Sequence, residues 1–248
     1  MKIEYVTMTG ADDNTSIEEM SRLSEKYPFA EWGILFSGDG SRRPRYPQSE
    51  WVDNLFGHQM RLSAHLCGSW VGDPLKTGRL TFLNDWEMED LFGRVQLNMN
   101  VGRLVAALHP EAGALLWEAI GVTKPVILGG DYVGIDLWNT PVTIDPRRFW
   151  SDEVYVMYDT SGGRGHLTQK WLPPIVVNET SLFTGYAGGL SPENLEEQLG
   201  LIEQACNVEV QEEPKIWIDA ETHLRNDKDE FDLERCEQFL KVAEAWVG

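Results

Sequence analysis

Acidic side chains stand at the ends of two short apolar segments of this sequence. Asp159 follows the run Val154–Tyr158, and Asp219 follows the run Lys215–Ile218 with Glu221 two residues later. Side chains alternate along a strand, so Asp219 and Glu221 are expected to point to the same side. Carboxylates transfer protons when burial or a neighbouring charge tunes their pKa. We therefore take Asp159 as a candidate acid or base, and Asp219 and Glu221 as groups that bind ribose hydroxyls, an amine or a metal.

His65 and Cys67 repeat the two-residue spacing at the end of another apolar run. A cysteine with a nearby histidine can act as nucleophile and base, and His65 or His223 could instead contact a ligand. Each acidic or sulfur group also has a plainer interpretation. Cys67 would be a small core side chain, and the carboxylates would be loop caps, buried hydrogen-bonded groups or solvated groups.

Three sites in the sequence could hold an anion. A basic loop contains Arg45, whose guanidinium suits an anionic group. Gly163, in the glycine-rich stretch after Asp159, could belong to a phosphate nest. Gly188 and Gly189 precede a helix start, where backbone N–H groups bind anions. The alternatives are a solvated surface loop for Arg45 and ordinary turns for the glycines.

Eight short apolar runs must position these groups. Runs that are apolar on both faces and alternate with helices predict a parallel sheet of βαβ units. The predicted strands are Ile3–Met8, Gly33–Ser37, Leu62–Leu66, Arg94–Leu97, Pro125–Leu128, Val154–Tyr158, Leu182–Tyr186 and Lys215–Ile218. The fold class is therefore α/β, a single (β/α)8 TIM-barrel domain over residues 1–248, close to the roughly 250 residues typical of that fold. An open sheet of about six strands is the alternative.

Three helices are defined by their ends. The helix over 16–26 begins with a capping box of Ser16 and Glu19. Ser191, followed by a proline, is the expected N-cap of another helix. An amphipathic helix over 232–246 closes the sequence.

Several segments spread along almost the whole chain share their order with one family. They are Thr7-Met8-Thr9-Gly10-Ala11, Ser41-Arg42-Arg43-Pro44-Arg45-Tyr46, Val95-Gln96-Leu97-Asn98, Tyr158–Gly165, Ala187–Asn194 and Ile218–His223. Together they resemble phosphoribosylanthranilate isomerase. The likeness is greatest in Ala-Gly-Gly-Leu-Ser-Pro-Glu-Asn, where the family has Ala-Gly-Gly-Leu-x-Pro-Glu-Asn.

The resemblance implies a barrel that performs an Amadori-type isomerisation of a phosphorylated amino-sugar. It implies that Asp159 is the general acid, that Arg45 contacts the anionic ring substituent of the substrate, and that Gly188 and Gly189 lie near its phosphate. The chain departs from the family in two places. Thr9 takes the position of the catalytic cysteine, and a threonine hydroxyl is a poor base at neutral pH.

The second departure is at the end of the last strand, where Glu221-Thr222-His223 replace Ser-Ser-Gly. A carboxylate beside a phosphate dianion is repulsive unless a cation lies between them. We therefore expect the protein not to be an efficient phosphoribosylanthranilate isomerase.

Composition restricts the partners. The 40 acidic and 21 basic residues give a formal net charge of −19, which disfavours nucleic acid and anionic membranes. The three cysteines form no CxxC pair, so a disulfide framework or zinc knuckle is not expected. No apolar leader and no run of about 18 apolar residues is present. We expect a cytoplasmic protein with a small-molecule ligand and no cofactor; the sequence leaves a homodimer open.

These observations predict a phosphoribosylanthranilate isomerase-like barrel enzyme of the isomerase or lyase type. It would use acid–base chemistry on a ribose- or sugar-derived small molecule, with Asp159, Thr9, His65 and Cys67 as the catalytic candidates. One alternative is a non-catalytic binding protein for a nucleotide- or sugar-like ligand, because one fold serves many functions. The other is a metal-assisted hydrolase that uses the carboxylates and His65.

Overall fold

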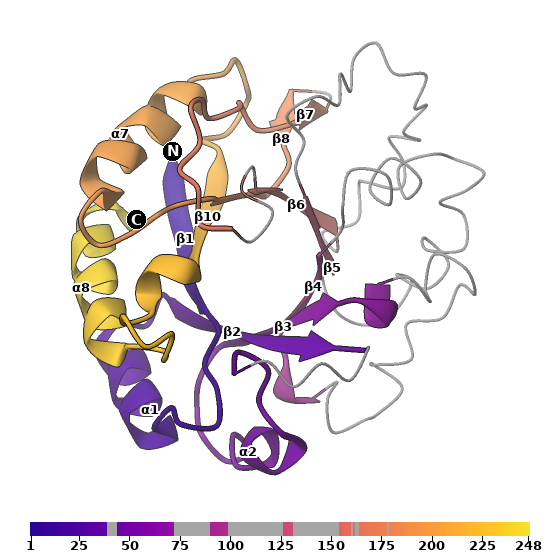
Figure 1. Cartoon of the computed structure of the whole chain (residues 1–248). Coiled ribbons are helices and arrows are strands. Elements are labelled where there is room, and N and C mark those ends of the chain that lie inside the picture. The colour runs from indigo at the N-terminus through magenta and orange to yellow at the C-terminus, as the bar shows by residue number, and fades with distance from the viewer. Residues whose placement is uncertain are drawn as a thin grey trace.

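Eight parallel strands form a closed barrel in the computed structural model (Figure 1). The structure describes residues 1–38, 44–71, 90–98, 126–130, 154–159, 161, 164–177 and 179–248, with only the backbone for 126–130, 154 and 177. The strands are β1 (Lys2–Thr9), β2 (Ala30–Ser37), β3 (Leu62–Cys67), β4 (Arg94–Asn98), β5 (Val126–Gly130), β6 (Val154–Asp159), β9 (Thr184–Ala187) and β10 (Lys215–Ala220). Their order is β1-β10-β9-β6-β5-β4-β3-β2. All eight predicted runs contribute a strand, in a ring rather than in an open sheet of six.

The alternation of strand and helix is incomplete in the described residues. A short antiparallel hairpin, β7 (Val176–Val177) with β8 (Thr180–Ser181), lies between β6 and β9 where the predicted pattern has a helix. Pro173 and Pro174 precede this hairpin, and proline removes a helical hydrogen bond. The helices expected between β4 and β6 lie outside the described residues, so the complete (β/α)8 pattern stays a prediction.

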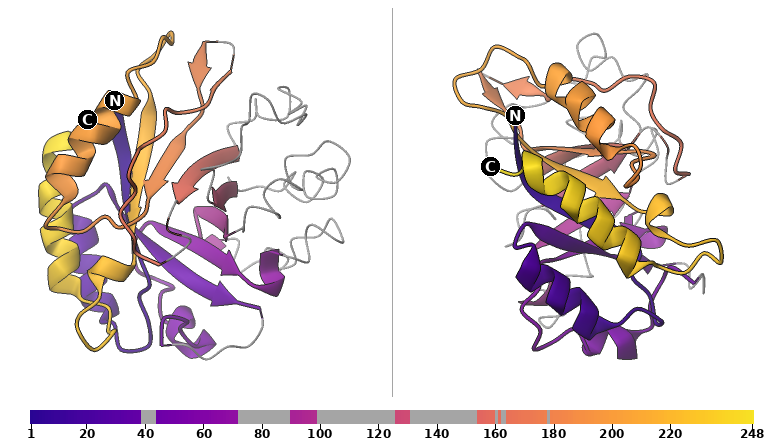
Figure 2. Two further views of the ribbon diagram at one scale, coloured as in Figure 1. Left: turned by 45° about the horizontal axis from the view of Figure 1, so that its top comes forward. Right: turned by 90° about the vertical axis from the view of Figure 1, so that its left-hand side faces the viewer.

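The outer layer on the β9-β10-β1 side consists of α1 (Ile17–Lys26), α7 (Leu195–Ala205) and α8 (Leu233–Ala243), as Figures 1 and 2 show. A short helix, α2 (Ser49–Asp53), follows β2. The faces of the long helices that meet the strands are apolar and fully buried; they include Met20, Leu23, Leu199, Ile202, Phe239 and Leu240. Each such side chain contributes about 1.5–3 kcal/mol through removal from water.

The structure confirms one of the two predicted helix caps. Ser16 caps α1 by accepting a hydrogen bond from the Glu19 amide at 3.2 Å, although the Glu19 carboxylate pairs with Arg22 and leaves the capping box half formed. The Asp232 side chain caps α8 by accepting hydrogen bonds from the Glu234 and Arg235 amides. The predicted start of α7 is wrong: a turn precedes the helix, which begins only at Leu195. The Asn194 side chain, rather than that of Ser191, makes the local bond, because its Oδ1 accepts from the Ser191 amide at 2.9 Å.

The strand register assigns a continuous set of polar side chains to the barrel interior. Thr7 pairs in register with Glu31 of β2 and with Asp219 of β10, and His65 pairs with Gln96 of β4. Because side chains alternate, the residues at these positions share the inner face. The interior therefore contains two layers of side chains with polar groups, one above the other along the barrel axis, which we call the lower tier and the upper tier.

The lower tier, toward the N-terminal ends of the strands, consists of Glu31, Arg94 and the rings of Tyr5, Tyr155, Phe183 and Trp217. The Arg94 guanidinium is bonded to the Glu31 carboxylate through both Nε and Nη2, and Thr7 Oγ1 donates to the same carboxylate at 2.8 Å. The guanidinium carbon lies 4.6 Å from the centre of the Trp217 ring and 4.9 Å from that of Tyr5. The charge is thus compensated by a carboxylate and by aromatic faces.

Candidate active site

The upper tier, toward the C-terminal ends of the strands, brings together Thr9, Gly33, His65, Gln96 and Asp219. Thr9 Oγ1 donates a hydrogen bond to Asp219 Oδ1 at 2.8 Å. His65 Nε2 faces the other carboxyl oxygen of Asp219, Oδ2, at 3.9 Å. All three side chains are buried. In parallel barrels the functional groups are found at this end of the strands.

Gly33 makes the close approach of these groups possible. A Cβ at this position would lie 2.3 Å from Thr9 Oγ1 and 2.9 Å from His65 Nε2, both shorter than van der Waals contact. The missing side chain therefore allows β1 and β3 to place their polar groups across β2. This requirement is steric, because the Gly33 backbone lies outside the left-handed region.

The electrostatics of the upper tier favour uncharged forms. Burial raises the pKa of Asp219 to about 8; the Thr9 hydrogen bond opposes this, and the charges of Glu221, Asp159 and Glu31 add to it. Burial, assisted by the positive charge of Arg94, lowers the pKa of His65 to about 3. At neutral pH the pair is therefore a carboxylic acid beside a neutral imidazole, and not a salt bridge.

A chain of amide hydrogen bonds fixes the imidazole from the other side. Gln96 Nε2 contacts His65 Nδ1 at 3.2 Å and donates to Asn98 Oδ1 at 2.9 Å. Asn98 Nδ2 in turn donates to Cys67 Sγ at 3.3 Å. His65 and Cys67 are thus bonded to different amides, and the structure does not favour the predicted pairing of one with the other.

An ion-paired rim surrounds the upper tier at the C-terminal ends of the strands. Arg45 contacts Glu221 Oε1 at 2.6 Å and Asp229 Oδ1 at 2.8 Å. Burial raises the pKa of Glu221, and Arg45 opposes that shift. Arg225 contacts Asp12 Oδ2 at 2.8 Å and the Gly10 carbonyl at 2.6 Å. The charge of Arg45 is therefore shared by two carboxylates.

Asp159, at the end of β6, accepts hydrogen bonds at Oδ1 from the Ser161 amide at 2.9 Å and from Ser161 Oγ at 2.7 Å. Its charge is one of the causes of the raised pKa of Asp219, which places it in the same electrostatic environment. His223 Nε2 is bonded to the Gly165 carbonyl at 2.8 Å, so this ring holds the loop after β6.

The predicted anion site is only partly described. Gly188 and Gly189 both have positive φ angles, 118° and 72°, as the tight turn after β9 requires. The Gly189 carbonyl accepts from Asn194 Nδ2 at 2.8 Å, which ties this turn to the start of α7. Gly163 lies outside the described residues.

Two solved structures share this arrangement of strands and helices. Phosphoribosyl anthranilate isomerase from Thermus thermophilus superposes with a TM-score of 0.54 at 16% sequence identity, over 99% of each chain. TrpF from Jonesia denitrificans gives a TM-score of 0.57 at 12% identity, over 97% of each chain. The fold is that of the phosphoribosylanthranilate isomerases. No family model matches the sequence and no curated protein is similar to it, so the likeness extends to the fold alone.

Thr9 takes the position of the family's cysteine in the sequence resemblance to phosphoribosylanthranilate isomerase. Its hydroxyl donates a hydrogen bond to Asp219 Oδ1.

Sequence reasoning missed four interior residues: Gly33, Glu31, Arg94 and Gln96. A signal for three of them was present, since charged or amide residues interrupt otherwise apolar runs at alternate positions, as in Arg94-Val95-Gln96-Leu97. Alternation of this kind marks one face of a strand. In a parallel barrel that face is the interior.

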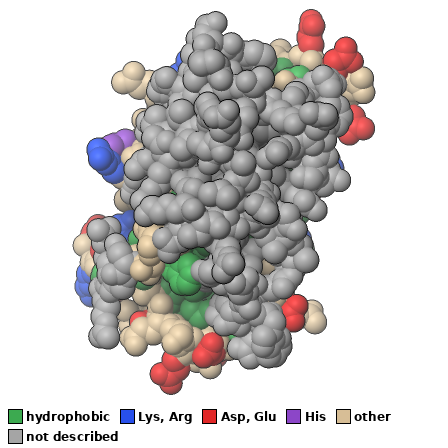
Figure 3. Space-filling model, turned by 90° about the vertical axis from the view of Figure 1, so that its right-hand side faces the viewer, with side chains coloured by type: hydrophobic (Ala, Val, Ile, Leu, Met, Phe, Trp, Pro, Cys, Tyr) green, Lys and Arg blue, Asp and Glu red, His purple; other side chains and the backbone are tan. Residues whose placement is uncertain are grey.

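Among the described residues, no group of three or more His, Cys, Asp or Glu side chains is arranged to hold a metal ion. Within the same part of the chain, no helix has the length and hydropathy needed to cross a membrane. Figure 3 shows acidic side chains at the edge of the face opposite the long helices, consistent with the negative net charge.

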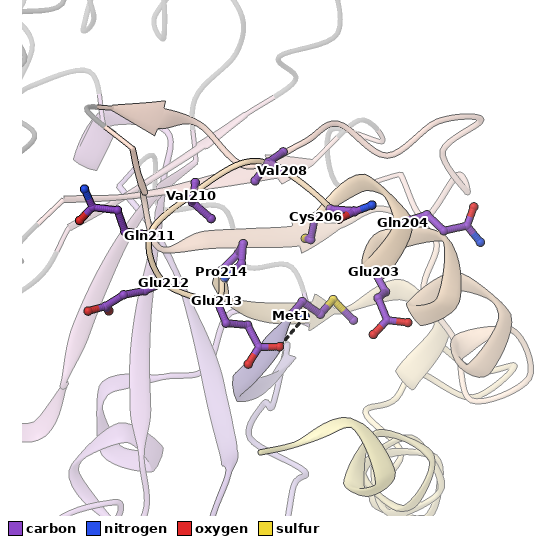
Figure 4. Close-up of a pocket in the computed structure, with 11 residues that line it drawn as sticks. Met1, Glu203, Gln204, Cys206, Val208, Val210, Gln211, Glu212, Glu213 and Pro214 are labelled. Atoms are coloured by element: carbon purple, nitrogen blue, oxygen red, sulfur yellow. Dashed lines mark ion pairs between the residues drawn. The ribbon is translucent and has the colours of Figure 1, made fainter.

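A pocket of about 490 Å³ lies at the other end of the barrel, near the start of β10 and the end of α7 (Figure 4). Its lining includes Met1, whose amino group pairs with Glu213 at 2.8 Å, and Cys206. Burial raises the pKa of the Cys206 thiol. This pocket contains none of the upper-tier residues, so we place the candidate active site at the strand ends.

Proposed function

We propose that the protein is a phosphoribosylanthranilate isomerase-like (β/α)8 barrel enzyme of the isomerase or lyase type. It acts by acid–base chemistry on a ribose- or sugar-derived small molecule. The observation that carries this proposal is the environment of Asp219, a carboxyl group whose pKa of about 8 keeps it protonated at neutral pH. Carboxyl groups in contrasting environments within one site are the usual basis for separate acid and base roles.

The two carboxyl groups have complementary roles in this proposal. Asp219 donates a proton, and Thr9 positions it through the bond to Oδ1. Asp159, for which the resemblance implies the role of general acid, takes the role of base in this proposal. Its Oδ1 accepts two hydrogen bonds from Ser161, and it receives a proton from the substrate carbon. Isomerisation of a hydroxy-carbonyl compound through an enediol needs one proton transfer at carbon and one at oxygen in each of its two halves.

The rim indicates how the ligand is held. Glu221 and Arg45 present an acceptor and a donor within 2.6 Å of each other, which suits the paired hydroxyls of a sugar. Because two carboxylates already share the charge of Arg45, a phosphate dianion gains less from it than from an unpaired arginine. We therefore propose a hydroxyl-rich substrate and inefficient turnover of phosphoribosylanthranilate.

We propose one barrel domain in the cytoplasm, with a small-molecule ligand as its main partner, without a cofactor, a nucleic acid or a membrane. Gly163, Gly188 and Gly189 remain the proposed contacts for an anionic group, and Cys67 and His223 line or support the site.

The test begins with a thermal-shift screen of sugars, sugar amines, nucleotides and phosphoribosyl compounds, because a ligand of the native state raises the melting temperature. Ligands that bind are then incubated with enzyme in D2O, and deuterium incorporation at carbon is followed by NMR. We expect Asp159→Asn to retain binding and to lose turnover by about 10²–10⁴-fold. Asp53→Asn, at an exposed position of α2, is the matched control and should retain full activity.

A binding protein without catalysis is the second candidate. It is favoured by one observation: Thr9, at the position of the family's catalytic cysteine, is committed to Asp219. Tight binding of a ligand that is recovered without deuterium or rearrangement, in wild type and variants alike, would establish this candidate and overturn the enzymatic one.

A further inference from the structure

The facing groups of His65 and Asp219 are buried, and their separation is unusual. His65 Nε2 lies 3.9 Å from Asp219 Oδ2, too far for a hydrogen bond between them. Among the described residues, His65 Nε2 has no hydrogen-bond partner although the ring is only 1% exposed. A buried polar atom left without a partner is rare in folded proteins, so its position needs an explanation.

The bond to Gln96 determines which nitrogen of His65 carries the proton. Gln96 Nε2 is an amide donor and lies 3.2 Å from His65 Nδ1. With this amide nitrogen as the donor, Nδ1 accepts and a neutral imidazole carries its proton on Nε2. The same nitrogen also donates to Asn98 Oδ1, whereas Gln96 Oε1 has no partner among the described residues.

The bond from Thr9 engages one oxygen of the Asp219 carboxyl group. The Thr9 hydroxyl donates to Oδ1. This leaves Oδ2, the oxygen that faces His65, to carry the proton of the neutral carboxyl group. Two donors, Nε2–H and Oδ2–H, thus point into the space between them, which explains why they do not bond to each other.

We propose that His65 Nε2–H and Asp219 Oδ2–H form a seat for one ligand oxygen, the carbonyl oxygen that becomes an enol during isomerisation. An oxygen about 2.8 Å from each donor satisfies both across a gap of 3.9 Å. Paired donors aimed at a developing oxyanion are an effective form of catalytic stabilisation. The seat selects an acceptor, so it takes a ketone or aldehyde oxygen and not an ammonium group.

The chemical step rests on the proposed function. Asp159 takes the proton from the hydroxyl-bearing carbon beside the carbonyl, and the electron pair of that C–H bond forms the C=C bond. The carbonyl π pair moves to oxygen, which takes the proton from Asp219 Oδ2 while His65 Nε2–H keeps its hydrogen bond, so an enediol forms. In the second half, the hydroxyl on the neighbouring carbon gives its proton to the Asp219 carboxylate as its own C=O bond forms, and the former carbonyl carbon takes the proton from Asp159, which restores both side chains.

The surroundings keep His65 in this role. Arg94 of β4, on one side of His65, is paired with Glu31 of β2. On the other side, toward β10, are Asp219, which faces the ring, and Glu221, which is paired with Arg45. The pKa of His65 is lowered to about 3 by burial and by Arg94. The ring therefore acts as a neutral donor throughout the pH range in which the protein is expected to work.

The first experiment is ¹⁵N NMR of the histidine side chains in the full chain, with His65→Gln used for assignment. We expect a protonated Nε2 and an unprotonated Nδ1 at pH 7. Gln96→Glu should reverse this, because a carboxylate accepts from Nδ1–H; exposed Gln48→Glu should leave the His65 signals unchanged. A wild-type ring that is protonated at Nδ1, or at both nitrogens, overturns the proposal.

The second experiment titrates the same sample with hydroxyacetone and, as its matched control, with propane-1,2-diol, which lacks the carbonyl. The seat predicts a saturable shift of the Nε2 and Nε2–H signals with the ketone alone. An unchanged signal, or the same shift with both compounds, contradicts the seat. Neither outcome requires turnover, so an intact seat without deuterium exchange overturns the proposed function alone.

Discussion

The two polar tiers of the barrel interior differ in how completely their groups are partnered. In the lower tier, Arg94 and Glu31 are bonded to each other, and Thr7 adds a third contact to the carboxylate. Arg94 Nη1 has no acceptor in the described residues, but its guanidinium lies against aromatic rings. In the upper tier, His65 Nε2 faces Asp219 without bonding to it.

In the proposed function, this difference separates a structural level, the lower tier, from a reactive one, the upper tier. A charge pair enclosed by rings is satisfied without any further molecule, and it fixes the strands around it. The upper tier holds two uncharged titratable groups with unused donors, at the end of the barrel where ligands bind. Variants should therefore affect mainly stability in the lower tier, and mainly protonation and ligand binding in the upper one.

The largest expected effect is in the lower tier. Replacing Glu31 by Leu leaves the Arg94 charge buried and unpaired, which should lower the free energy of unfolding by about 3–5 kcal/mol. Urea denaturation measures this loss. The double variant Glu31→Leu/Arg94→Met removes both charges, and it should recover most of the stability. If the double variant is no more stable than the single one, the pair is not the source of the effect.

The second effect is the pH dependence of stability, in which the two upper-tier groups oppose each other. The pKa of Asp219 is raised from 3.8 to about 8, so the folded state holds a proton that the unfolded state releases, and stability falls from pH 4 to 8. The pKa of His65 is lowered from 6.5 to about 3, so stability falls as pH decreases from 6.5 to 3. Each slope is at most about 1.4 kcal/mol per pH unit.

The contributions of Asp219 and His65 to the pH dependence of stability cancel between about pH 4 and 6.5. Variants that remove one group at a time reveal the contribution of the other. Relative to wild type, Asp219→Asn should become progressively more stable as pH rises from 4 to 8. His65→Gln should gain stability relative to wild type as pH falls below 6.5. Urea denaturation at each pH unit checks both. Parallel profiles for the wild type and both variants would mean that these groups have ordinary pKa values and the upper tier is not distinct.

The sequence predicts the strands of the barrel better than the environments of the side chains inside it. The eight strands were predictable, because the strands of a parallel sheet are buried on both faces and therefore appear in the sequence as short apolar runs. Asp159, Asp219 and Glu221 were found as strand-end carboxylates. Their different environments were not, since burial and neighbouring charge depend on which strands become adjacent when the barrel closes.

Contacts between distant segments were the least predictable part. Gly33 lies in an apolar run, and nothing local indicates that Thr9 and His65 approach it from both sides. The pairing of Arg45 with Glu221 joins loops 176 positions apart in sequence. The N-terminal turn of α7 was misassigned because Ser191 and Asn194 are both good capping residues, and tertiary packing decides between them.

A smaller effect tests the steric link between strands. Gly33→Ala places a methyl group against Thr9 and His65, and overpacking of this kind costs about 1–3 kcal/mol. It should also displace the Thr9–Asp219 bond, which ¹⁵N NMR of His65 and the pH profile would report. Gly93→Ala is the control, since its Cβ would meet no atom closer than 3.7 Å. Equal losses for both variants would remove the special role of Gly33.

The smallest expected effect on stability is at the rim, where Arg45 and Glu221 are each 24% exposed. Pairs that water can reach contribute about 1 kcal/mol or less. Arg45→Gln should therefore leave the free energy of unfolding nearly unchanged while raising the pKa of Glu221, because Arg45 opposes the effect of burial on that carboxyl group. Lys26→Gln, in a surface pair with Glu237, should change neither quantity. If Arg45→Gln lowers the free energy of unfolding as much as Glu31→Leu does, the rim has a structural role like that of the lower tier. The proposed reactive groups would then be limited to His65, Asp219 and their immediate partners.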